Sequence, residues 1–212
     1  MFLPEYTITN KILKNIAAVE YAKALAENTP ILPTLEETIQ KEALYDLTKT
    51  ICLEMEKQFS ENQIKMAVDG LLPAVPPDLA AIVKTVTYTT RAEEDYSNSA
   101  LKKLYQTLLG IEEVSKVSYR SQRIAKYLEP EELLAGLVEL MDWCQSVDAL
   151  ETHPIIFAGV LRARLEIIAA FETISPVVSN LFTRMALKWR GYSINGFLKY
   201  EERFMADKQW YQ

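Results

Sequence analysis

Hydrophobic residues recur every three or four positions along most of the chain. The first run covers residues 8–27 and places apolar side chains on one face before it ends at Asn28, Thr29 and Pro30. That spacing is the repeat of an amphipathic helix. Similar runs follow one another, with capping or breaking residues between them. The pattern therefore predicts a chain that is helical almost throughout.

The later runs carry their own start and stop signals. Thr34, with Glu37 three residues on, is expected to cap a second helix that extends to about residue 58, and Ser60 with Gln63 is expected to cap a third. The other expected helices cover residues 78–96 with Asp78 as the cap, 98–109 closed by Gly110, 133–147, 154–174, 180–190 and 194–211. Residues 83–90 are rich in Val, Thr and Tyr, so a short strand is an alternative there. The predicted fold class is an all-α domain.

The clearest break in the pattern lies at residues 71–77, which hold three prolines. Proline removes a backbone donor and does not fit inside a helix. We expect this break to separate an N-terminal helical region, residues 1–75, from a larger region, residues 76–212. A length of 212 residues is typical of one compact unit that contains both regions.

The composition excludes several common active sites. The chain has only six glycines and one histidine, and 49% of its residues are hydrophobic. Few glycines disfavour a glycine-rich phosphate loop and a Rossmann turn. One histidine excludes two-histidine zinc motifs and most di-iron helices.

Charge and cysteine usage limit the expected partners and location. The net charge of −6 gives no general attraction to nucleic acid or to an anionic membrane, so neither is expected as a partner. No apolar run is long enough to span a bilayer, and no signal peptide is visible at the N-terminus. Cys52 and Cys144 are isolated, which is typical of buried free thiols in a reducing compartment. The expected location is the cytoplasm.

Two clusters of polar residues have a functional and a structural interpretation. His153 precedes Pro154, with Arg162 and Arg164 downstream, which suggests a general base with phosphate-binding arginines. An exposed histidine before a proline that starts a helix is the simpler interpretation, and we prefer it. A set of carboxylates suggests a metal site, but a solvated helical turn also explains it, so no metal site is expected. This set is Glu112, Glu113, Glu129, Glu131 and Glu132.

One segment resembles a known family. Residues 171–176, Phe-Glu-Thr-Ile-Ser-Pro, are similar to the segment that leads into the signature of the Fic family, Phe-Glu-Thr-Ile-His-Pro-Phe. Weaker likenesses follow in the family's order along nearly the whole chain, at residues 8–13, 50–54, 60–70, 117–122, 154–170, 191–192 and 200–211. The resemblance implies an all-helical fold. It also implies descent from enzymes that transfer AMP from ATP, with Mg²⁺, to a target hydroxyl.

The Fic signature continues as His-Pro-Phe-x-Asp/Glu-Gly-Asn-Gly-Arg-x-x-Arg, and this chain departs from it. On that pattern Ser175 takes the place of the catalytic histidine and Ser179 that of the Mg²⁺-binding acid, and Pro176 is retained. The other positions hold Val177 for the phenylalanine, Asn180, Leu181 and Phe182 for the anion loop, Thr183 for the first arginine with Arg184 one residue late, and Ala186 for the second arginine. Serine does not titrate near neutral pH and does not act as that base. Bulky side chains also block the approach of phosphate to backbone N–H groups.

The resemblance assigns roles to two further segments. Thr50 and Glu54 match the inhibitory helix motif, whose glutamate pairs with the second signature arginine, so Glu54 is expected to face Ala186. Met55 follows where the family has Gly or Asn. Tyr119 and Arg120 match the segment before the target-docking flap, and residues 120–130 are short for a full hairpin. We therefore expect N-terminal helices packed on a Fic-like core, with at most a vestigial flap.

The hypothesis that follows is a catalytically degenerate Fic-like protein without nucleotide-transfer activity. It would act as a binding or regulatory module, through an unknown protein partner or through self-association, and would need no cofactor although the family uses ATP and Mg²⁺. The alternative is an adenylyltransferase-like enzyme with altered or residual chemistry, in which Asn180, Thr183 and Arg184 still hold an anion. A third alternative is a DNA-linked regulator, which the acidic charge disfavours.

Overall fold

The computed structural model describes residues 2–71, 74–113 and 116–193, and these residues form helices and connecting segments with no strand. The helices are α1 (Asn10–Asn28), α2 (Pro33–Glu54), α3 (Glu61–Val68), α4 (Pro77–Arg91), α5 (Asn98–Leu109), the short 3₁₀ turn η3 (Pro130–Glu132), α6 (Leu133–Cys144), α7 (Val147–Glu151), α8 (Pro154–Ile168) and α9 (Ser175–Trp189). The all-α prediction is confirmed. Residues 83–90 lie inside α4, so the alternative of a strand there is wrong.

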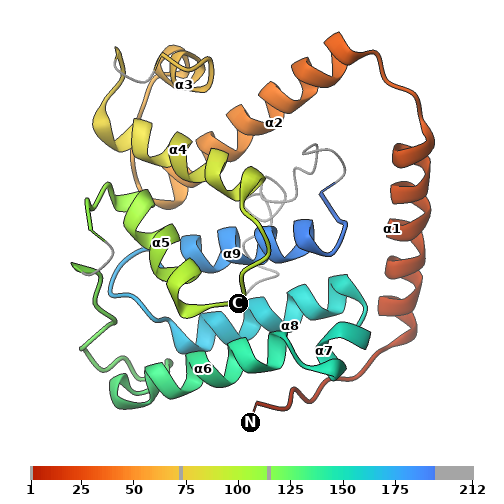
Figure 1. Cartoon of the computed structure of the whole chain (residues 1–212), viewed down its shortest axis with the longest axis vertical. Helices are drawn as coiled ribbons and strands as arrows, with labels where there is room; N and C mark the ends of the chain where they lie inside the picture. Colours follow the sequence, from red (N-terminus) through yellow and green to blue (C-terminus); the bar gives the residue numbers. More distant parts are fainter. Residues whose placement is uncertain (1, 72–73, 114–115, 194–212) are drawn as a thin grey trace.

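Helix α9 lies at the centre of the molecule. It packs against α8 on one side and against α4 and α5 on the other, and α6 lies beyond α8 (Figure 1). Between Val177 and Ala186 only Asn180 and Arg184 are not buried. A helix that is buried almost all round is a core element rather than a surface element.

The core extends from α2 to α9. Its largest fully buried side chains include three aromatic residues, Trp143, Phe157 and Phe182. The rings of Trp143 and Phe157 stack at 5.2 Å between centroids, and Tyr96 meets Phe157 edge-on at 5.8 Å. Aromatic pairs of this kind bury large areas and fix the spacing of the helices that carry them.

Three of the predicted capping residues are confirmed. Ser60 forms a reciprocal capping box with Gln63 at the start of α3, and Gly110 closes α5 in the left-handed region. The predictions for Thr34 and Asp78 are wrong, because α2 starts at Pro33 and α4 at Pro77. Proline has no N–H to satisfy and a fixed φ, so it takes the first position of each helix and moves the cap upstream.

Several predicted boundaries are also wrong. Helix α4 ends at Arg91 rather than near residue 96. The helix expected over residues 133–147 ends at Cys144, and the short α7 follows it from Val147. Helix α8 ends at Ile168, and α9 starts at Ser175 rather than at residue 180. The expected helix 194–211 lies outside the described residues. In the described part of the chain, no helix has both the length and the apolar character needed to cross a membrane.

Candidate functional site

The loop between α8 and α9 determines how the candidate site is built. Ala169 and Ile174 both have left-handed backbone conformations, with φ of 43° and 50°. These two residues end α8 and turn the chain into α9 five residues earlier than the pattern predicted. Side chains other than glycine rarely adopt this region, so the loop stores strain that the surrounding core must hold.

Ser175 braces this loop. Its hydroxyl accepts a hydrogen bond from the backbone N–H of Phe171 and donates one to the Phe171 carbonyl, both at 2.8 Å. The side chain of Phe171 is buried and stacks on Tyr105 at 4.1 Å between ring centroids. Ser175 itself is only 8% exposed. Its hydroxyl therefore already uses its donor and one acceptor site to satisfy the buried N–H and carbonyl groups of Phe171.

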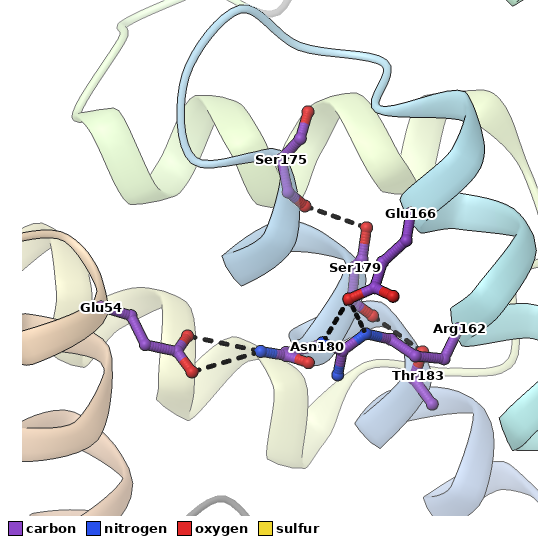
Figure 2. Close-up of polar contacts among 7 residues, drawn as sticks. All are labelled: Glu54, Arg162, Glu166, Ser175, Ser179, Asn180 and Thr183. Carbon is purple, nitrogen blue, oxygen red and sulfur yellow. Dashed lines mark hydrogen bonds and ion pairs between the residues drawn. The ribbon is translucent and has the colours of Figure 1, made fainter. Parts of the chain in front are cut away.

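The other two hydroxyls of the segment also bond to their own helix. Ser179 donates to the Ser175 carbonyl at 2.9 Å, and Thr183 donates to the Ser179 carbonyl at 2.8 Å, as Figure 2 shows. Both side chains are buried. This i to i−4 arrangement satisfies buried hydroxyls without any outside partner.

Two of the three positions that resemble the anion loop, and the position of the second signature arginine, belong to the core, whereas Asn180 is half-buried. Leu181 is 1% exposed, and Phe182 and Ala186 are fully buried. The Phe182 ring meets the rings of Tyr96 and Trp189 edge-on, at 6.5 Å and 6.1 Å between centroids. These residues fill the space beside α9 with packed side chains.

Glu54, at the end of α2, contacts α9 through Asn180. The Asn180 amide nitrogen lies 3.3 Å and 3.4 Å from the two Glu54 carboxylate oxygens (Figure 2). The expectation that Glu54 faces Ala186 is therefore wrong. Ala186 lies six residues further along α9 on another, fully buried face. Thr50, one turn earlier on α2, is also buried. The segments that resemble the inhibitory motif and the signature thus meet through the Asn180 amide.

Arg120 joins the flap-like segment to the loop that precedes α9. Its guanidinium donates to the carbonyl oxygens of Ala169 at 3.1 Å, of Leu128 at 2.5 Å and of Gln122, and the side chain is 3% exposed. Its backbone N–H donates to the Ala170 carbonyl at 2.8 Å. Arg120 is therefore a buried side chain that holds these backbone segments together by hydrogen bonds.

Tyr119 lies beside the same loop and packs against its buried phenylalanine. Its ring is 5.9 Å from the Phe171 ring, and the Lys102 ammonium lies 4.4 Å above its centroid. Burial raises the pKa of the Tyr119 phenol. Residues 116–128 contain no strand.

The basic residues around His153 do not converge on an anion site. Arg162 pairs with Glu166 at 2.8 Å on the side of α8 that faces Asn180 of α9 (Figure 2). The Arg164 guanidinium lies 5.0 Å from the centre of the Phe2 ring. Arg184 is half-buried on α9. Two members of the carboxylate set, Glu129 and Glu131, form ion pairs with Arg123 at 3.1 Å and 3.0 Å.

His153 is half-buried rather than exposed, so that expectation is wrong. Its Nδ1 atom accepts a hydrogen bond from the Ile155 N–H at the start of α8. Its Nε2 atom lies 3.2 Å from the Glu20 carboxylate, which also accepts a hydrogen bond from the Tyr192 hydroxyl. That hydrogen bond lowers the pKa of Glu20. Sequence reasoning missed Glu20 and Tyr192, because nothing local in the sequence links residues so far apart.

Comparison with known proteins supports the resemblance at the level of fold. No protein-family profile and no curated protein matches the sequence. Among solved structures, the crystal structure of a Fic family protein from Desulfovibrio desulfuricans G20 superposes with a TM-score of 0.77 and 18% sequence identity. The superposition covers 99% of this chain and 67% of that one. The chain therefore has the helical fold of a Fic family protein.

Proposed function

We propose that the chain is a Fic-like binding or regulatory module that has lost nucleotide-transfer chemistry. The observation that carries this proposal is the Ser175 hydroxyl. By the resemblance of residues 171–176, it takes the place of the family's catalytic histidine, and it is buried and hydrogen-bonded to both backbone groups of Phe171. A hydroxyl in this position does not take a proton from a target, because it does not titrate near neutral pH and is already bonded.

The residues around Ser175 do not fit the Mg²⁺–nucleotide that the fold family implies. Magnesium prefers carboxylate and water oxygens, whereas Ser179 supplies a hydroxyl that is buried and bonded to its own helix. A triphosphate needs exposed backbone N–H groups and cations, and Leu181 and Phe182 instead pack into the core. The same side chains argue against the alternative of residual transfer chemistry, since this part of α9 is packed into the core and offers an anion no polar contact from these two residues.

Two contacts support a structural role for the region around Ser175. Glu54 and Asn180 still join α2 to α9, and Arg120 still ties the flap-like segment to the loop before α9. We propose that these contacts hold a rigid helical scaffold in the cytoplasm that recognises a protein partner or a second copy of the chain. Neither nucleic acid nor a membrane is part of this proposal.

A thermal-shift titration with ATP and Mg²⁺ tests the loss of nucleotide binding. A ligand at 100 times its Kd stabilises a protein by about 2.7 kcal/mol, which raises the melting temperature of a chain of this size by roughly 5–10 °C. We expect no shift at millimolar ATP, CTP or UTP. Glu54→Ala is the matched control, because it removes the carboxylate nearest Asn180, and it should show no shift either. A shift of several degrees with ATP that Asn180→Ala abolishes would overturn the proposal.

A further inference from the structure

The N-terminal arm, defined as residues 2–28, makes few contacts with the other helices in the part of the chain that the structure describes. Helix α1 contains no buried residue and makes only sparse contacts with the other described helices. It lies at the edge of the molecule in Figure 1, connected by an extended N-terminal segment below and by a short connection to α2 above. Most of the stability of a helix in a protein comes from packing of one face against other elements, and α1 has little of this packing among the described helices.

Two specific contact points nevertheless anchor the arm. At one end, the Phe2 ring meets Trp143 edge-on at 5.6 Å, beneath the Arg164 guanidinium. At the other end, Glu20 accepts a hydrogen bond from Tyr192 and lies 3.2 Å from His153. These contacts fix the position of the arm on the body of the protein. The same contacts form equally well with the arm of a second copy of the chain.

Between these anchors the arm does not close on the body. A hollow of about 990 Å³ separates residues 3–8 from α7 and the start of α8. The contact across it is a weak one, between the Tyr6 hydroxyl and Thr152 Oγ1 at 3.5 Å. Between the two anchors, opening the arm therefore breaks few contacts.

The connection between α1 and α2 is suited to an open conformation. Thr29 and Leu32 both have extended backbone conformations, and Pro30 and Pro33 fix φ on either side. A proline also pushes the residue before it toward extended conformations. Four residues in this state reach roughly 14 Å, which favours passing the arm to a neighbour over folding it back.

Exposed leucines surround this connection. Leu25 is 52% exposed, Leu32 is 72% exposed and Leu35 is 51% exposed. When two chains exchange identical arms, their two connections run past each other at the twofold axis. The leucines of one copy then cover those of the other, which removes apolar surface from water.

From these observations we propose that the N-terminal arm exchanges between two copies of this chain, so that each arm binds the body of the other and the leucines around the connection form the new interface. This gives the proposed binding module its partner, a second copy. It rests on the geometry of the arm alone, so it fails or stands separately from the loss of nucleotide transfer.

Light scattering coupled to size-exclusion chromatography of the full chain tests for the dimer. We expect twice the mass of one chain at tens of micromolar. Leu32→Ser combined with Leu35→Ser should raise the dimer dissociation constant by about tenfold or more, since both side chains lie in the proposed interface and are exposed in one copy. A monomer at every concentration overturns the proposal.

Crosslinking shows whether the arms cross. Full-length Tyr6→Cys and Thr152→Cys chains are unfolded, mixed, refolded together and treated with a short bismaleimide. Exchange predicts a crosslinked dimer in the mixture and not with either variant alone. Cys52 and Cys144 are buried and give no background. A dimer that yields no such crosslink associates by another surface and overturns the proposal, as does a Tyr6→Cys/Thr152→Cys double variant that crosslinks only within single chains.

Discussion

Replacing Ser175 by alanine should destabilise the fold, because the hydroxyl satisfies a buried peptide group. The substitution removes the hydrogen bonds to the N–H and the carbonyl of Phe171, each 2.8 Å long. Leaving a buried donor or acceptor unsatisfied costs about 1–3 kcal/mol. Together the two losses predict a decrease of about 3 kcal/mol in the free energy of unfolding. For a chain of this size that corresponds to roughly 6–12 °C in melting temperature.

Ser179→Ala is the matched control on the same helix. Its hydroxyl donates to the Ser175 carbonyl, which also lies within the hydrogen-bonding pattern of α9. Because no backbone group is left unsatisfied and alanine favours helix, the change should cost no more than about 0.5 kcal/mol. Urea unfolding followed by circular dichroism measures both variants. If Ser175→Ala is as stable as wild type, or if Ser179→Ala loses as much stability as Ser175→Ala, the stabilising role assigned to the Ser175 hydroxyl is refuted.

Three further predictions concern other parts of the fold. Arg120→Ala should lower the free energy of unfolding by about 3–5 kcal/mol in urea, because three carbonyl oxygens lose a buried donor, and Arg120→Lys by about half as much. Glu56→Gly should stabilise the protein by about 0.5–1 kcal/mol, because Glu56 ends α2 at φ 56°, where glycine is unstrained. Burial raises the pKa of Cys52 to about 11 and of Cys144 to about 12. Both thiols should therefore resist Ellman's reagent at pH 8 in the folded protein and react after unfolding.

The raised thiol pKa values also fix the sign of a pH dependence. The stability gained by keeping these thiols neutral is fully present below their ordinary pKa of 9.0 and is lost as pH rises toward 11. The urea midpoint should therefore fall over that range. Three results would contradict these predictions. They are a loss of stability in Glu56→Gly, unchanged stability in Arg120→Ala, and rapid labelling of the thiols in the folded protein.

The sequence predicted the helical class and most helices, because their three-to-four periodicity is a local property. It misplaced the start of α9 by five residues. The pattern treats Pro176 as the end of the preceding helix, whereas Pro176 lies in the first turn of α9, and the left-handed conformations of Ala169 and Ile174 separate the two helices. Those conformations are imposed by packing and by the bonds of Ser175, so no local propensity signals them.

The position of the candidate site stays a prediction from the resemblance, and the sequence did not predict the contacts of its residues. The resemblance located Ser175, Glu54 and Arg120, whose roles depend on residues far away in the chain. Glu54 meets Asn180 instead of Ala186, and Arg120 is buried against the carbonyl of Ala169. Such long-range pairs arise only when the helices pack together.

The most direct test of the central claim is a transfer assay. The full chain is incubated with α-labelled ATP, CTP or UTP and with Mg²⁺ or Mn²⁺, alone and with cell lysate, and label on protein is measured after electrophoresis. The loss of nucleotide-transfer chemistry predicts no label above that of heat-denatured protein, for wild type and for Glu54→Ala alike. Label on the chain itself or on lysate proteins, lost in a Ser175→Ala variant that is still folded at the assay temperature, would contradict it.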